Sequence, residues 1–145
     1  FDIANVRNVV ADLGAPGIDP IEEEKFVALG EDMDIMIMDA AAVKNIAPLF
    51  QEDDTLFDSC KAWQEGEVYL QMAYNAYYTN YETALINAWY IGKTVYPDAF
   101  ADIDMTKKTD QVTEMFLGQG LAEEIFAYPS SFGGYQKIDT ASFFR

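Results

Sequence analysis

The chain has 145 residues, half of them apolar, and its 25 acidic and 9 basic residues give a net charge of −16. This length suits one domain with a packed core, and the apolar fraction argues against disorder of the whole chain. The negative charge disfavours nucleic acid and anionic lipid as partners and is compatible with a basic or aromatic-accepting protein surface. No apolar run approaches the roughly 20 residues that span a bilayer, so we expect no membrane-spanning segment.

The N-terminal region predicts two helices. Apolar residues at helical spacing indicate a first helix over residues 2–13. Asp19 and Pro20 are residue types favoured at the N-cap and the first helical position, and they predict the start of a second helix. Gly30 is expected to end or bend that helix.

Residues 32–39 fit two kinds of structure. Ile35 and Ile37 belong to an alternating pattern that is typical of a strand, but the alanine run at 40–42 favours a helix. We predict one helix over this region. It should end before Pro48, because the residue that precedes a proline resists the α conformation.

The next segment is dominated by tyrosine, since seven of the nine tyrosines lie between Glu67 and Tyr96. Their spacing follows one stripe of an α-helix, formed by Leu70, Tyr74, Tyr77, Tyr81, Ala84 or Leu85, and Ala88. A helix of about forty residues, bent at Gly66 and finished by Gly92 and Pro97, is therefore predicted from near residue 52.

The C-terminal third predicts one more helix, over residues 106–127, interrupted or kinked near Gly118 and Gly120. Residues 129–145 are interpreted as an irregular, aromatic tail. The predicted fold class is therefore all-α, an antiparallel bundle of four or five helices over residues 1–128 followed by the tail at 129–145.

Metal and catalytic motifs are weak in this sequence. The chain has no histidine and one cysteine, Cys60, so the usual general base and a transition-metal site are not expected. Asp102 and Asp104 begin like an EF-hand loop, but Lys107 replaces the required glycine and Thr113 the required glutamate. We therefore expect no cofactor, and a solvated loop that leads into a helix cap.

The likeliest function on this basis is a non-enzymatic, acidic accessory or scaffolding subunit that docks onto a larger protein assembly through aromatic residues. Tyrosine and tryptophan are enriched where proteins meet, and an aromatic tail gains most when it is buried against something, whether a partner or the bundle itself. The candidate contact residues are Tyr77, Tyr78, Tyr81, Trp89, Phe132, Tyr135, Phe143 and Phe144. In size and architecture, such a bundle is analogous to the small helical extrinsic subunits of photosystem II, although those are basic.

Two other functions remain open at this stage. A small-ligand carrier would use a cavity between helices lined by tyrosines and the methionines Met33, Met36 and Met38. An enzyme using Asp, Glu or Tyr acid–base chemistry would need carboxylates that converge in a cleft, one with a raised pKa. The compartment is unknown, and a start at Phe1 is compatible with processing for a secreted, periplasmic or organelle-lumen location.

Overall fold

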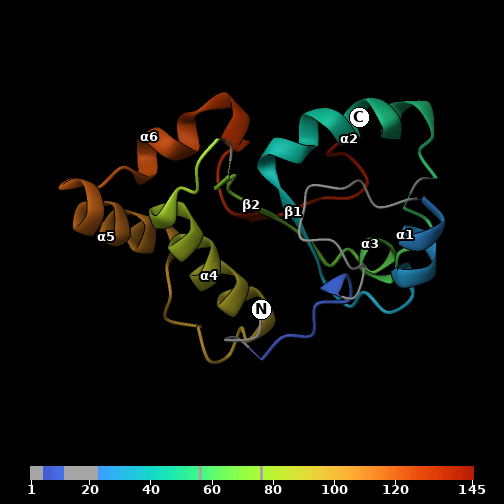
Figure 1. The fold of residues 1–145 in the computed structure, drawn as a ribbon, viewed down its shortest axis with the longest axis horizontal. Helices are drawn as coiled ribbons and strands as arrows, with labels where there is room; N and C mark the ends of the chain where they lie inside the picture. Colours follow the sequence, from blue (N-terminus) through green and yellow to red (C-terminus); the bar gives the residue numbers. More distant parts are fainter. Residues whose placement is uncertain (1–4, 12–22, 56, 76) are drawn as a thin grey trace.

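The computed structural model describes residues 5–11, 23–55, 57–75 and 77–145, which form an α/β fold (Figure 1). The elements in chain order are α1 (Glu23–Gly30), β1 (Met36–Asp39), α2 (Ala40–Glu52), α3 (Lys61–Gln64), β2 (Val68–Gln71), α4 (Tyr81–Val95), α5 (Met105–Leu117), α6 (Ala122–Ala127), η3 (Pro129–Ser131) and β3 (Gln136–Lys137). The prediction of an all-α bundle was therefore wrong, because a sheet runs through the middle of the described chain.

The sheet has the strand order β1-β2-β3. β1 and β2 are parallel, with Met36 opposite Val68, and the chain crosses from one to the other through α2 and α3. β3 is antiparallel to β2, with Leu70 opposite Gln136. β1 is thus an edge strand, and the central strand β2 is the more buried, since Val68 and Leu70 are fully enclosed.

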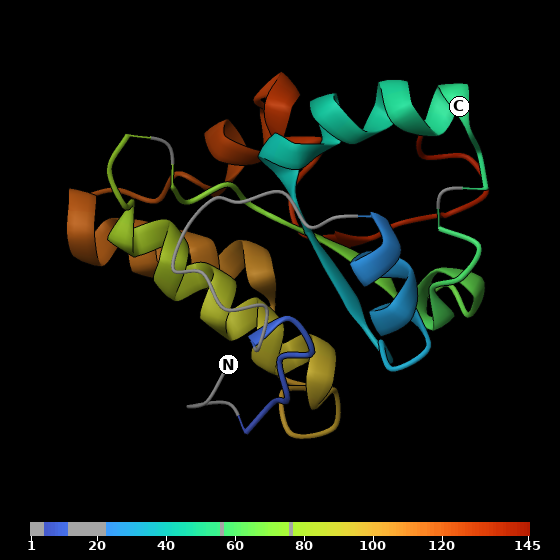
Figure 2. The same ribbon diagram turned by 45° about the vertical axis from the view of Figure 1, so that its right-hand side comes forward.

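The helices form two groups around this sheet. In Figures 1 and 2, α1, α2 and α3 lie at one end of the molecule and α4, α5 and α6 at the other, with the strands between them. Among the described residues, no helix combines the length and the hydrophobicity that crossing a membrane would require.

The region at 32–47 corrects one prediction in detail. The alternating residues end in the strand β1, and the alanine run begins the helix α2 immediately after it. Asp39 separates the two, since its Oδ1 accepts a hydrogen bond from the backbone N–H of Ala41 at 2.8 Å and so caps α2. α2 also continues through Pro48 to Glu52, so the predicted stop before the proline was wrong.

The predicted forty-residue tyrosine helix does not form; the chain there consists of the short helix α3, the strand β2, a loop and the helix α4. Gly66 has a positive φ of 68°, so the chain turns there instead of bending a continuous helix. The strand β2 follows, then a loop, and only α4 is a long helix. After the turn at Gly66, Val68 pairs in register with Met36 of β1, and its side chain is fully buried.

At the two ends, the predictions had mixed outcomes. Residues 5–11 contain no α-helix, so the first predicted helix is wrong where it can be examined, while the start expected at Asp19 lies outside the described residues. α1 does end at Gly30, and the last predicted helix is two, α5 and α6, separated at Gly118, which adopts the left-handed conformation with φ 81°. Asp104 caps α5 as expected, accepting hydrogen bonds from two backbone N–H groups.

The core lies beneath α2 and contains a cluster of aromatic rings. Phe50 of α2 lies 5.5 Å from Trp63 and 5.3 Å from Phe144, measured between ring centroids. Phe57 lies 4.6 Å from Trp63 and completes the cluster. The C-terminal residues 129–145 are therefore not an irregular tail, because they supply both the strand β3 and a core ring.

Candidate functional site

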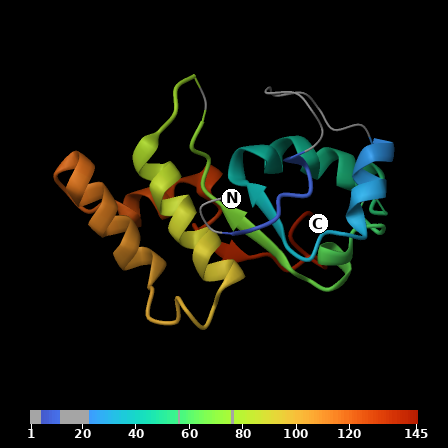
Figure 3. The same ribbon diagram turned by 60° about the horizontal axis from the view of Figure 1, so that its bottom comes forward.

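Four exposed tyrosines stand on the connection between β2 and α4. We call residues 72–81 the tyrosine loop; the last of them, Tyr81, is also the first residue of α4. Figure 3 shows the connection between β2 and α4 extending away from the body of the molecule. Tyr77 is 97% exposed, Tyr78 89%, Tyr81 73% and Tyr74 38%.

The base of the loop is anchored by hydrogen bonds of the backbone. The N–H of Asn80 donates to the carbonyl oxygen of Tyr74 at 2.7 Å, and Asn75 and Thr79 form an isolated antiparallel bridge. The Asn80 side chain also accepts from the N–H of Thr83 at 2.9 Å and so caps α4. The loop therefore leaves a strand and enters a capped helix, and its two arms are held together.

The strand β2 and the tyrosine loop carry no charged residue, and Glu82 is the first one after them. Residues 68–81 contain no Asp, Glu, Lys or Arg, in a chain whose net charge is −16. A large aromatic ring in water gains little for folding, because the free energy of burial comes from removing apolar area from solvent. The loop thus concentrates exposed apolar area where charge is absent, a composition typical of contact surfaces.

The loop also begins at a distinctive edge of the sheet. β1 and β2 are parallel, so their carboxyl ends, at Asp39 and Gln71, lie at one edge and face each other in the register. In open α/β sheets, ligands bind outside the carboxyl ends of the strands. The tyrosine loop is the continuation of β2 at that edge.

Trp89, another predicted contact residue, packs inside the helical group formed by α4 and α5. Its ring lies 6.0 Å from that of Phe100 in an edge-on arrangement, and the Lys108 ammonium lies 4.1 Å from its centroid. Trp89 is half-buried and stabilises the contact between α4 and the segment that follows it.

Tyr135 takes part in an internal hydrogen-bonded network. Its hydroxyl donates to Oδ1 of Asn87 at 2.7 Å, and the Asn87 amide donates to the carbonyl oxygen of Met72 at 2.8 Å. The neighbouring Tyr90 donates to the carbonyl oxygen of Gln136 at 2.9 Å, and its ring centroid lies 4.7 Å from that of Tyr135. Burial raises the pKa of both phenols well above the usual value.

The three C-terminal phenylalanines are arranged in order of increasing burial. Phe132 is 40% exposed, Phe143 is half-buried, and Phe144 is 4% exposed within the core cluster. Successive rings are in contact, with centroids 5.9 Å apart for Phe132 and Phe143 and 5.0 Å apart for Phe143 and Phe144. These rings are packed against the chain itself, and only Phe132 presents much of its surface to solvent.

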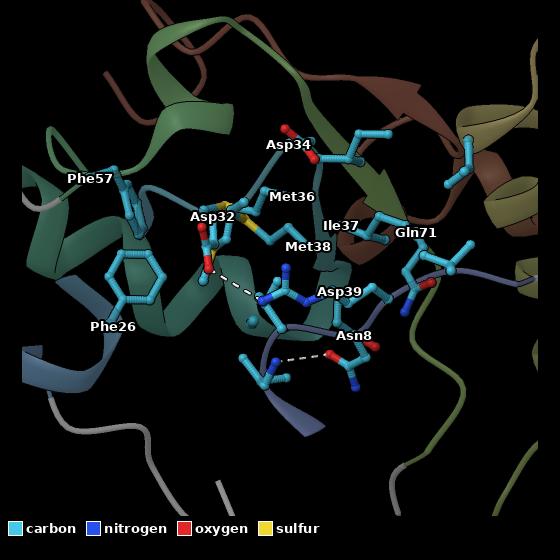
Figure 4. Close-up of a pocket in the computed structure, with 18 of the residues that line it drawn as sticks. Asn8, Phe26, Asp32, Asp34, Met36, Ile37, Met38, Asp39, Phe57 and Gln71 are labelled. Atoms are coloured by element: carbon cyan, nitrogen blue, oxygen red, sulfur yellow. Dashed lines mark hydrogen bonds and ion pairs between the residues drawn. The ribbon is translucent and has the colours of Figure 1, made fainter. Parts of the chain in front are cut away.

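A cavity of about 710 Å³ lies along β1, away from the tyrosine loop (Figure 4). Its walls include the three methionines Met33, Met36 and Met38 together with residues 5–10. No residue of the tyrosine loop lines it. The methionines and the tyrosines, which the carrier hypothesis placed in one cavity, are therefore in two places.

The titratable groups with shifted pKa values in the described chain are held by hydrogen bonds and ion pairs or by burial. Glu67 accepts hydrogen bonds from Lys137 and from the hydroxyl of Tyr69, both at 2.7 Å, and these bonds hold the pKa of its carboxyl below the usual value. Every described carboxyl group with a shifted pKa has it lowered, whereas a general acid needs it raised. Within the described ranges, no three His, Cys, Asp or Glu side chains gather as metal ligands would.

Tyr74 was not named among the candidate contact residues, and the cavity along β1 was not predicted. Tyr74 was assigned to the stripe of a helix, although it is 38% exposed in a loop. The alternation at residues 32–39 was the signal that could have located β1 and the cavity beside it. No protein-family model matches the chain, and no curated protein matches it.

Proposed function

We propose that the chain is a non-enzymatic docking domain that binds a partner protein through the tyrosine loop. The observation that carries the proposal is the group of four exposed tyrosines on an anchored, uncharged loop. Of the predicted contact residues, Tyr77, Tyr78 and Tyr81 are the ones that this loop brings together.

The composition of the loop supports a protein partner. Binding loops of antibodies are enriched in tyrosine, serine, glycine and asparagine, because a tyrosine ring supplies contact area with few rotatable bonds and the small polar residues supply adaptable hydrogen bonds. Residues 74–81 read YNAYYTNY and share the tyrosine and asparagine of that composition, with threonine and alanine as the small residues. Tyrosine is also among the residues that contribute most binding energy in protein interfaces.

The acidic charge of the rest of the chain supports a partner with a basic rim. Residues 1–66 carry 15 acids and 4 bases, and residues 67–145 carry 10 acids and 5 bases. Charges around an uncharged contact accelerate encounter more than they tighten the complex. The analogy to extrinsic photosystem subunits rested on a helical bundle and has no support in this fold.

A small-ligand carrier is the second candidate, and the position of the loop favours it. The loop starts where the parallel strands β1 and β2 end, which is the edge where α/β sheets bind small molecules. A ligand at that edge would be stacked against tyrosine rings. The two candidates differ in the size of the bound species, which mass spectrometry of the captured material measures.

The proposal is tested by comparing capture by three immobilised proteins from an extract of the native source. The first is the wild type, and the second is Tyr77→Ser with Tyr78→Ser. The third is a control that removes two exposed apolar side chains elsewhere, Tyr128→Ser with Leu49→Ser, at residues 66% and 55% exposed. A stoichiometric protein kept by the wild type and the control and lost by the loop variant is the expected result. Equal capture by all three proteins, or no stoichiometric protein on any, contradicts docking by this loop.

A further inference from the structure

Among the residues that the structure describes, β1 pairs with β2 on one side and with no strand on the other. In a parallel pair of strands, successive residues direct their backbone N–H and carbonyl groups to alternate sides. The N–H of Met36 points toward β2, since it donates to the backbone carbonyl oxygen of Glu67 at 3.0 Å. The N–H and carbonyl of Ile37 therefore face away from β2. In the described part of the chain, no backbone hydrogen bond joins β1 to residues 5–11 on the opposite wall.

This edge has few of the features that protect edge strands. Natural edges are shielded by charged side chains, proline, bulges or a covering element. The run from Ile35 to Met38 is uncharged and apolar, and Asp39 is the first charged residue after it. The edge thus has the chemistry of a template for another strand.

The space beside the edge is large enough for an extended peptide. The cavity of about 710 Å³ follows the chain from Asp32 to Asp39, the whole length of β1 and the turn before it (Figure 4). Its far wall is apolar, with Val6, Val9 and Phe26. Ligand sites of proteins occupy roughly 300–1,000 Å³, so the space is in the range of a bound segment.

The charges at the entrance are mainly acidic. Asp32 and Asp34 stand before the start of β1, both exposed, and Asp39 stands at its end. Asp32 already accepts a hydrogen bond from the Arg7 guanidinium of the opposite wall at 3.3 Å, and Asp34 pairs with Lys61 at 2.5 Å. Both ion pairs are exposed, and with the exposed Glu31 the start of β1 carries three acids against these two bases, so an added cation there meets a net negative charge.

We propose that the free edge of β1 is a β-augmentation site, which binds an extended, apolar segment of another polypeptide carrying a lysine or arginine beside Asp32 and Asp34. Main-chain hydrogen bonds to Ile37 supply affinity, and the apolar walls hold alternate side chains. Gln71, at the carboxyl end of β2 on the cavity wall, has a buried Oε1 without a hydrogen-bond partner in the described chain, and an added segment brings donors to this wall. This site shares no residue with the tyrosine loop, so either proposal can fail without the other.

The test uses short capped peptides of alternating valine and threonine, labelled for fluorescence anisotropy. One peptide has lysine at its first position and another at its last, which covers both strand directions. Saturable binding of one of them, weakened by salt, is expected. The matched control is the same peptide with alternate backbone amides methylated, which keeps the side chains and removes the donors.

A variant of the protein tests the same contact from the other side. Ile37→Pro removes an N–H that faces the cavity and leaves the β1–β2 ladder intact, since proline is tolerated at edge positions whose N–H is unpaired. We expect peptide binding roughly 3- to 10-fold weaker, with Ile37→Val as the control that retains wild-type affinity. Asp32→Asn with Asp34→Asn, which leaves the strand unchanged, should weaken the lysine peptide and not its glutamine counterpart.

Three results would overturn the proposal. One is the absence of saturable binding by either lysine peptide to the wild type. The second is equal binding of the methylated peptide, which would show an apolar pocket and not strand pairing. The third is a concentration-dependent dimer in sedimentation that Ile37→Pro abolishes, which would make a second copy of this chain the occupant.

Discussion

Two sets of tyrosines are placed in opposite environments. Tyr77 and Tyr78 in the tyrosine loop are 97% and 89% exposed, while Tyr90 in α4 is 6% exposed and packs on Tyr135. The hydroxyls of the buried pair each donate to a protein acceptor. The comparison shows that the internal tyrosines serve the fold, and that the loop tyrosines are free to serve a contact.

The C-terminal phenylalanines extend the same comparison and give the largest expected effect. Phe144→Ala removes a core ring that is 4% exposed, and the free energy of unfolding should fall by about 3–5 kcal/mol. Phe132→Ala, at a residue that is 40% exposed, is the control and should cost less. Urea unfolding measures both, and equal losses would show that Phe144 does not belong to the core.

The internal network predicts a smaller loss. Tyr135→Phe leaves Oδ1 of the buried Asn87 without its donor, so the free energy of unfolding should fall by about 1–3 kcal/mol. Tyr128→Phe, at an exposed tyrosine, should leave the unfolding midpoint unchanged. If Tyr135→Phe left the free energy of unfolding unchanged, the hydrogen bond from Tyr135 to Asn87 would not stabilise the fold.

The buried pair also predicts a dependence on alkaline pH. Burial raises the pKa of Tyr90 and Tyr135 above the ordinary value of 10.0, so the folded state keeps protons that the unfolded state releases. Their contribution to stability is complete below that ordinary value and is lost as the pH rises through it toward the folded-state pKa. Over that range, each tyrosine lowers the free energy of unfolding by at most about 1.4 kcal/mol for each unit of rising pH. Urea midpoints measured from about pH 9 to about pH 11 should fall less steeply for Tyr90→Phe with Tyr135→Phe than for the wild type.

The loop tyrosines predict the smallest effect on stability. Tyr77→Ser with Tyr78→Ser should shift the free energy of unfolding by no more than about 0.5 kcal/mol, because neither ring is packed. Thermal unfolding followed by circular dichroism checks this. A loss of several kcal/mol would mean that the loop folds onto the body of the protein and is not available for docking.

The secondary structure that depends on local residue chemistry could be predicted from the sequence. Gly30 does end α1, Asp104 caps α5, and Gly118 separates α5 from α6 through its positive φ. Each of these is decided by one or two residues and their own backbone. They did not reveal the fold class, because a fold depends on which segments pair.

Only β1 had a signal in the sequence, the alternation at residues 32–39, and the alanine run after it outweighed that signal. β2 has four residues and β3 has two, too few for a period of two to show against neighbouring helices. Burial does alternate along β2, with Val68 and Leu70 buried and Tyr69 and Gln71 half-buried, but the large ring of Tyr69 hides this alternation in the sequence. The turn at Gly66 and the pairing with β1 fix the conformation of β2. The pairing joins segments that are far apart in the sequence, and the local spacing of residues does not reveal it.

The candidate site was predicted in part. Tyr77, Tyr78 and Tyr81 were named as contact residues, and the structure groups them on one loop, whereas Phe144 was named with them and is a core residue. A tyrosine suits a core, a cavity or a surface equally well, so composition alone does not separate these environments. The hydrogen bonds that close the loop between Tyr74 and Asn80 make the difference, and they are tertiary features.

The most direct test of the docking account is chemical modification of the tyrosines, followed residue by residue with mass spectrometry, in the free protein and after saturation with its captured partner. In the free protein, Tyr77, Tyr78 and Tyr81 should react readily, while Tyr90 and Tyr135 should be protected. With the partner bound, the loop tyrosines should become protected and the exposed Tyr128 should not change. Loop tyrosines that react equally in both states would contradict the claim that this loop is the contact surface.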